Sequence, residues 1–72
     1  MYIVIEIQTN TDGSIGTIVN SYEDQRDAES KYHTILSYAA KSQLPMHSAV
    51  ILTNDGMGYA SQCYTHGENE NE

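Results

Sequence analysis

The side chains best suited to chemistry are one cysteine and three histidines: Cys63, His33, His47 and His66. Thiolate and imidazole groups can together bind a metal ion or form a nucleophile–base pair. Cys63 and His66 stand three positions apart in a predicted strand, and an odd offset places two strand residues on opposite faces. His33 lies in a predicted helix and His47 in the loop after it. The spacing therefore predicts no metal site and no cofactor, and Cys63 is expected to be a small apolar strand residue.

The acidic side chains do not suggest a catalytic pair. Glu6 is the one acid inside a predicted strand, where we expect it to face solvent. Gly56-Met57-Gly58 looks like a phosphate-binding loop, but no helix N-terminus follows it. Catalysis needs a positioned base and nucleophile. Since neither is recognisable, the sequence predicts a protein that is not an enzyme.

The aromatic residues are six tyrosines, with no Phe or Trp. Tyrosine combines a large contact surface with a polar tip, which interfaces favour. Tyr32 lies in the apolar stripe of the predicted helix, and Tyr22 could pack onto its first turn. The candidates for stacking on a partner or ligand are Tyr38, Tyr59 and Tyr64.

The formal charge is −7, from ten acidic residues against three basic ones. All the basic residues lie on the predicted helix, so no strand offers the basic stripe that direct nucleic-acid binding requires. An acidic surface favours a basic protein partner, although it also serves solubility. The candidate acidic contacts lie at the start of the helix: Glu23, Asp24, Asp27 and Glu29.

Short strands must position these residues. Residues 2–8 alternate in polarity like a half-buried strand, and residues 15–20 are rich in β-branched side chains. Residues 9–14 have turn chemistry, with Gly13 able to adopt positive φ, so the two strands form a hairpin. Gly16 predicts weakened pairing or a bulge in the second strand.

Residues 24–42 form the predicted helix, for which either Ser21 or Asp24 could be the N-cap. Pro45 prevents its continuation. The apolar stripe that should face the sheet is Ala28, Tyr32, Ile35 and Ala39.

Residues 48–53 and 59–65 form a second hairpin after the helix. Two hairpins and one helix predict an α+β fold of ββαββ type, a four-stranded, mainly antiparallel sheet with the helix packed on one face. We expect residues 1–66 to be a single domain and residues 67–72 to be an acidic flexible tail.

A single helix covers only one face of such a sheet. If Ile3, Ile5 and Ile7 face the helix, Tyr2 and Val4 face outward. The second and third strands carry apolar residues on both faces, and such strands are usually covered on both. The sequence therefore predicts a homo-oligomer, at least a dimer, formed by face packing or edge pairing.

The lone cysteine and the absence of a secretory leader favour a reducing cytoplasm. No apolar run approaches the roughly 18 residues that a membrane span needs. We therefore expect a cytoplasmic protein that does not contact a membrane.

A family resemblance involves the opening Met-Tyr-Ile-Val-Ile-Glu-Ile-Gln-Thr-Asn-Thr-Asp-Gly, residues 28–33 (Ala-Glu-Ser-Lys-Tyr-His) and residues 47–52 (His-Ser-Ala-Val-Ile-Leu). These stretches resemble small uncharacterised proteins of gut Clostridia and their phages, over most of the chain. The resemblance carries no functional motif, so it implies a context and no site residue. That context is counter-defence, as in anti-CRISPR inhibitors or sponges that sequester nucleotide immune signals.

These features predict a non-enzymatic, stoichiometric binding protein, phage- or prophage-borne, that disarms a host antiviral defence. In one mechanism the acidic helix start docks on a basic effector protein and mimics phosphates. In the other, tyrosines at a subunit interface stack on a nucleotide base while Arg26, Lys31 or His33 holds a phosphate. The alternative is a small oligomeric structural or regulatory module without a defence role.

Overall fold

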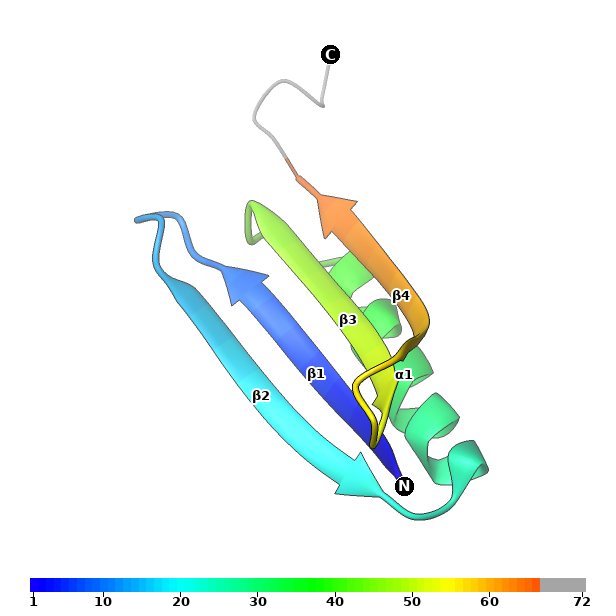
Figure 1. Cartoon of the computed structure of the whole chain (residues 1–72). Helices are drawn as coiled ribbons and strands as arrows, with labels where there is room; N and C mark the ends of the chain where they lie inside the picture. The colour runs from blue at the N-terminus through cyan, green and yellow to red at the C-terminus, as the bar shows by residue number, and fades with distance from the viewer. Residues whose placement is uncertain (67–72) are drawn as a thin grey trace.

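The computed structural model describes residues 1–66, and the predicted acidic tail of residues 67–72 lies outside the described residues. The elements follow the predicted order (Figure 1): β1 (Tyr2–Thr9), β2 (Ile15–Tyr22), α1 (Gln25–Ala40), β3 (Met46–Thr53) and β4 (Gly58–Thr65). This confirms the ββαββ, α+β prediction. The observed strands are slightly longer than expected because pairing continues beyond the apolar positions.

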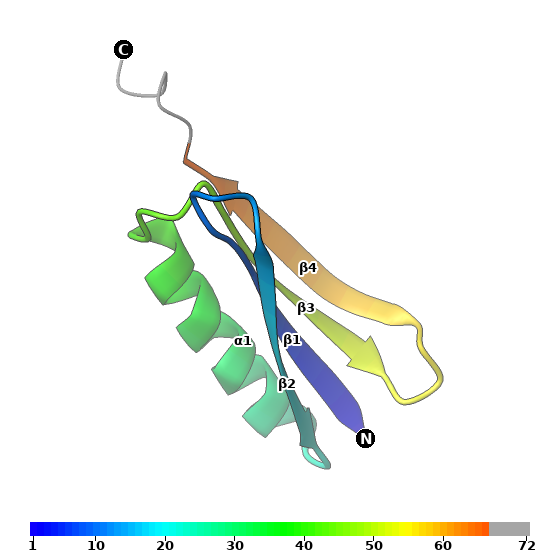
Figure 2. The same cartoon turned by 90° about the vertical axis from the view of Figure 1, so that its left-hand side faces the viewer.

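All four strands join one antiparallel sheet in the order β2-β1-β3-β4. Each hairpin contributes its first strand to the centre, so β1 and β3 are neighbours although the helix separates them in sequence. The helix lies across one face of this sheet (Figures 1 and 2) and contacts β3 and β1 more than the edge strands. It leaves the other face of the sheet open (Figure 2).

The two hairpin turns rely on glycines in the left-handed region. Gly13 has a φ of 90° and Gly56 a φ of 88°, a conformation that costs glycine nothing. The positive φ predicted at Gly13 is therefore confirmed. Next to it, the Asp12 carboxylate accepts hydrogen bonds from the backbone N–H and the hydroxyl of Ser14, which hold the pKa of Asp12 below its usual value.

Asp24 caps the N-terminus of α1, because its Oδ1 accepts a hydrogen bond from the Arg26 N–H at 2.8 Å. Ser21, the other predicted cap, still belongs to β2. Among residues 1–66 no helix is long and apolar enough to cross a membrane. The predicted apolar stripe is fully buried: Ala28, Tyr32, Ile35 and Ala39.

The core lies between this stripe and the helix-facing positions of β1 and β3. Its buried residues are Val4, Ala28, Tyr32, Ile35, Ala49 and Ile51. Partly buried residues close its margins: Tyr2, Tyr22, Leu36 and Ala60. The position of Tyr22 against the core agrees with its predicted packing near the helix start.

The predicted orientation of β1 was wrong. We expected Ile3, Ile5 and Ile7 beneath the helix and Val4 outside, whereas Val4 has no exposed surface and lies in the core. Alternation shows that the three isoleucines share a face but does not identify the face. Pairing with β3 sets Val4 beside the buried Ile51, and this leaves the isoleucines on the open face.

Of the two possibilities predicted for Gly16, weakened pairing or a bulge, the bulge was wrong, because Gly16 pairs in register with Gln8. The register shifts instead between Ile51 and Leu52, which pair with Ala60 and Gly58. One additional residue, Tyr59, is therefore accommodated in β4 as in a β-bulge. The irregularity belongs to an edge strand, where bulges are common.

Candidate functional site

Acidic side chains surround the N-terminal end of α1. Glu23, Asp24 and Asp27 are exposed and Glu29 is half-buried. Carboxylates are stabilised at this end of a helix because the unpaired backbone N–H groups give it a partial positive charge. We name Glu23, Asp24, Asp27 and Glu29 the acidic helix surface.

Arg26 lies inside the acidic helix surface. Its guanidinium, with the side chain 88% exposed, is 3.2 Å from Asp24 Oδ2. Hydrogen bonds from the side chain and backbone of Arg26 hold the pKa of Asp24 below its usual value. Arg26 is thus already paired with a carboxylate and is a weaker candidate for holding a phosphate than its sequence position suggested.

Tyr59 joins β4 to the acidic helix surface. Its hydroxyl donates to Glu29 Oε2 at 2.5 Å, and the Gln25 amide donates to the Tyr59 hydroxyl. The Tyr59 bond is the main reason why the pKa of Glu29 is lowered and, reciprocally, why that of Tyr59 is raised. The Tyr59 ring also lies 6.0 Å from the Tyr2 ring. The register shift in β4 therefore places Tyr59, a predicted aromatic contact residue, next to Glu29, a predicted acidic contact residue.

The other two candidate tyrosines lie elsewhere. Tyr38 is 67% exposed on the C-terminal half of α1. Tyr64 is half-buried, and its ring stacks almost parallel to that of His66, with centroids 6.4 Å apart. The structure therefore does not bring Tyr38, Tyr59 and Tyr64 together at a single stacking site within one chain.

The candidate phosphate-binding residues are also divided. Arg26 and His33 are two helical turns apart and therefore share a side of α1, where both are exposed. Lys31 is half-buried, and its charge helps to lower the pKa of Glu6 in the sheet. Within one chain, Arg26, Lys31 and His33 do not converge.

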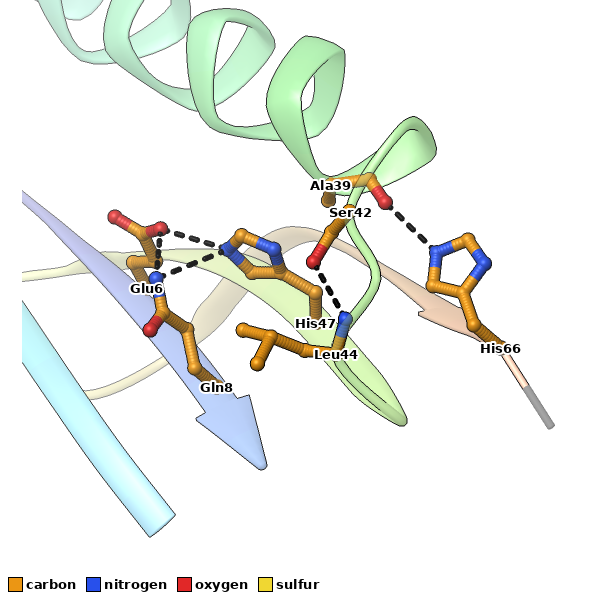
Figure 3. Close-up of polar contacts among 7 residues, drawn as sticks. All are labelled: Glu6, Gln8, Ala39, Ser42, Leu44, His47 and His66. Atoms are coloured by element: carbon orange, nitrogen blue, oxygen red, sulfur yellow. Dashed lines mark hydrogen bonds and ion pairs between the residues drawn. The ribbon is translucent and has the colours of Figure 1, made fainter. Parts of the chain in front are cut away.

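A polar cluster that the sequence did not predict lies between the C-terminal half of α1 and the sheet (Figure 3). His47 is 4% exposed, and its Nε2 lies 2.7 Å from Glu6 Oε2. The Gln8 amide donates to the same carboxylate oxygen at 2.9 Å and lies 3.4 Å from the imidazole nitrogen. We name Glu6, Gln8 and His47 the buried polar cluster.

Burial disfavours ionisation of Glu6, but the hydrogen bonds from His47 and Gln8 outweigh it and lower the pKa of Glu6. The remaining ring nitrogen, His47 Nδ1, is buried without a hydrogen-bond partner among the described residues. On the other side of the loop, His66 Nε2 lies 2.9 Å from the Ala39 carbonyl at the end of α1 (Figure 3). The buried polar cluster therefore joins β1 to β3, and His66 joins the end of β4 to the end of α1.

Two predictions are corrected by this cluster. Glu6 was expected to face solvent, yet its side chain is 13% exposed, and His47 was expected in a loop, yet it belongs to β3. The sequence could have predicted this cluster only if β1 and β3 were known to be neighbours, because Glu6, Gln8 and His47 then share one face of the sheet. Without knowledge of that pairing, the sequence does not show that Glu6 and His47 are in contact.

Among residues 1–66, no three His, Cys, Asp or Glu side chains converge as metal ligands would. No protein-family model, curated protein or solved structure matches the chain. The functional conclusion therefore depends on the placement of charge, aromatic surface and apolar surface in this fold.

Proposed function

We propose that this chain is a non-enzymatic binding protein whose acidic helix surface docks stoichiometrically on a basic groove of a protein partner. The observation that carries the proposal is the combination of exposed carboxylates with Tyr59, which Glu29 holds in place by a hydrogen bond. Carboxylates set at the spacing of a helix end can replace the phosphates that such a groove normally binds.

The charge state of this surface suits the role. Asp24 and Glu29 are ionised at neutral pH, and hydrogen bonds lower the pKa of each carboxyl further. Tyr59, 41% exposed, supplies an aromatic contact among these charges. Interfaces commonly combine an aromatic anchor with a charged rim that speeds association and selects the partner.

The resemblance to proteins of gut Clostridia and their phages gives the proposal its context. In that context the chain is phage- or prophage-borne, acts in the bacterial cytoplasm and disarms a nucleic-acid-binding effector of host antiviral defence. Guide-loaded nucleases hold their nucleic acid in a positively charged channel, which an acidic protein can occupy. The chain itself then needs no direct contact with nucleic acid.

The test is competition with DNA for guide-loaded Cas9-type nucleases. We expect the protein to reduce DNA binding at an equimolar ratio, with an affinity that falls as salt concentration rises. Asp27→Asn should weaken the effect. Asp12→Asn is the matched control, because it removes the same charge from the turn at the opposite end of the sheet (Figure 1). Equal losses from the two substitutions, or no inhibition by the wild type, would contradict the proposal.

A second candidate function is sequestration of a nucleotide signal. The observation in its favour is the pair Arg26 and His33, exposed on the same side of α1. In a thermal-shift assay with linear and cyclic nucleotides, a binder should raise the unfolding temperature. If no nucleotide raises the unfolding temperature, this candidate is removed.

The third candidate is an oligomeric structural or regulatory module without a defence role. The observation in its favour is the apolar surface that β2 and the central strands expose on the open face, including Ile15 and Val19. Such a module would assemble normally but leave every effector unaffected in the competition assay.

A further inference from the structure

Among residues 1–66, no element covers the face of the sheet opposite α1 (Figure 2), and the side chains on that face are mostly apolar. Paired residues in an antiparallel sheet point to the same side, so the register shows which side chains lie on the face opposite α1. We name this face, which includes small residues on β4, the open sheet face. Its apolar residues include Ile3, Ile5, Ile7, Val19, Val50 and Leu52.

The open sheet face has no charged side chain among residues 1–66. The acids and bases lie instead in the turns, in and around α1, and, for Glu6, on the helix side of the sheet. Several of its apolar side chains are strongly exposed, with Ile15 at 67%, Val19 at 60% and Met46 at 43%. An apolar surface without charge, in a chain of net charge −7, is typical of an interface.

We infer that a second copy of this chain covers the open sheet face, so that two sheets pack face to face with their helices outside. A second copy brings an equally uncharged, apolar surface to the contact. It also keeps its own acidic helix surface on the far side, where repulsion between the two acidic chains is screened by water and salt.

The size of the face is sufficient for a dimer. Eight-residue strands are about 26 Å long, and four of them are about 19 Å wide, which gives a face of about 500 Å². Two such faces contribute about 1,000 Å² before the relief of the side chains is added, which meets the lower limit of about 1,000 Å² for a biological interface. Sheets stacked in this way lie about 10 Å apart.

The shape of the face selects one orientation. Large side chains stand on β2 and β1, whereas β4 carries small ones, and Ser48, Ser61 and Cys63 help to line a depression beside β4. A two-fold axis parallel to the strands places β2 of one copy over β4 of the other. The exposed Val19 then fills the partner's depression, and the relation is reciprocal, as two-fold symmetry requires.

The first experiment measures molar mass by light scattering at micromolar concentration. We expect twice the 8.0 kDa of one chain. Val19→Asp should shift the protein to the monomer, because the charge would be buried against the second sheet. Thr17→Glu tests the same face independently if Val19→Asp fails to fold, as judged by circular dichroism.

Tyr38→Asp is the matched control. It adds the same charge on the outer side of α1, at a position about as exposed as Val19. It should leave the dimer unchanged. A wild type of 8.0 kDa, or folded Val19→Asp and Thr17→Glu variants that remain dimers, would overturn the inference.

The second experiment tests the orientation. Thr17, Ile7, Ser48 and Cys63 share one row across the open sheet face, with Thr17 on one edge strand and Cys63 on the other. In the inferred dimer, Thr17 of one copy lies opposite the partner's Cys63. A short bismaleimide linker, matched to the ~10 Å between sheets, should therefore link Thr17→Cys chains covalently through Cys63.

Cys63→Ser in the Thr17→Cys background should abolish this link, because the two Thr17 positions lie over opposite edges. If the link persists without Cys63, β2 lies over β2, and the proposed orientation is wrong. These results are independent of the effector assay, so failure of the dimer and failure of the proposed function can be told apart.

Discussion

The buried polar cluster and the Glu29–Tyr59 contact share one arrangement. In each, a carboxylate forms a hydrogen bond with the side chain of an aromatic residue, His47 or Tyr59, from another element. In the first, His47 and Glu6 are almost enclosed between α1 and the sheet. In the second, Tyr59 and Glu29 lie at the margin of the helix, open to water. Water can replace a lost partner in the exposed pair but not in the buried one. The buried pair should therefore control stability, and the exposed pair should mainly shape a surface.

His47→Ala should give the largest effect. It removes one of the two hydrogen-bond partners of the nearly enclosed Glu6 carboxylate and leaves Gln8 as the other, and a loss of this kind costs about 1–3 kcal/mol. Urea unfolding at fixed protein concentration measures the loss. Glu6→Leu combined with His47→Leu should recover most of it, because an apolar pair leaves no charge unpaired. If the single variant is as stable as wild type, the contact between His47 and Glu6 does not stabilise the fold.

Glu6→Gln should reduce the dependence of stability on acid pH. The pKa of Glu6 in the folded protein lies below its usual value of 4.5, so the unfolded chain takes up the proton first as pH falls. The contribution of Glu6 is therefore complete above 4.5 and is lost as pH falls through the lowered folded value. Parallel stability profiles for wild type and Glu6→Gln over this window would contradict the expectation.

Asp24→Ala should have a smaller effect, confined to the helix start, because it removes the cap from the Arg26 N–H. Far-ultraviolet circular dichroism should show slightly less helix and an earlier thermal midpoint. Asp24→Asn keeps an oxygen in the capping position and should behave almost as wild type. If Asp24→Ala destabilised the protein as much as His47→Ala, the exposure of a contact would not determine its contribution to stability.

Tyr59→Phe should have the smallest effect on stability and a clear local one. Without the phenol hydroxyl, the pKa of Glu29 should rise towards its usual 4.5, which NMR titration of the side-chain carboxyl carbon measures. The thermal midpoint should move less than in any variant of the buried polar cluster. An unchanged Glu29 pKa would mean that the hydrogen bond is not formed in solution.

The elements of this fold were readable because each depends on local spacing. The stripe from Ala28 to Ala39 identifies the helix, and Gly13 and Gly56 mark turns that need positive φ. The side of the sheet that the helix covers was not readable, because the alternation in β1 groups Ile3, Ile5 and Ile7 on one face without showing which face the helix covers. Only the pairing of β1 with β3 places Val4 in the core.

The same limit applies to the sites. The four acids could be found because helix starts favour carboxylates and the sequence places them there. The partnership of Glu6 with His47 depends on a register between strands that are distant in sequence, so local spacing gave no sign of it. Tyr59 was a candidate as an aromatic residue, but its contact with Glu29 required the shifted register of β4.

The central position of β1 and β3 has a consequence for synthesis on the ribosome. The first hairpin can form as soon as it emerges, but the inner edge of β1 has no neighbour until residues 46–53 follow. During that interval the nascent chain exposes an unpaired strand edge rich in isoleucine, a state prone to aggregation. Translation speed through the helix codons should therefore influence how much protein reaches the native state.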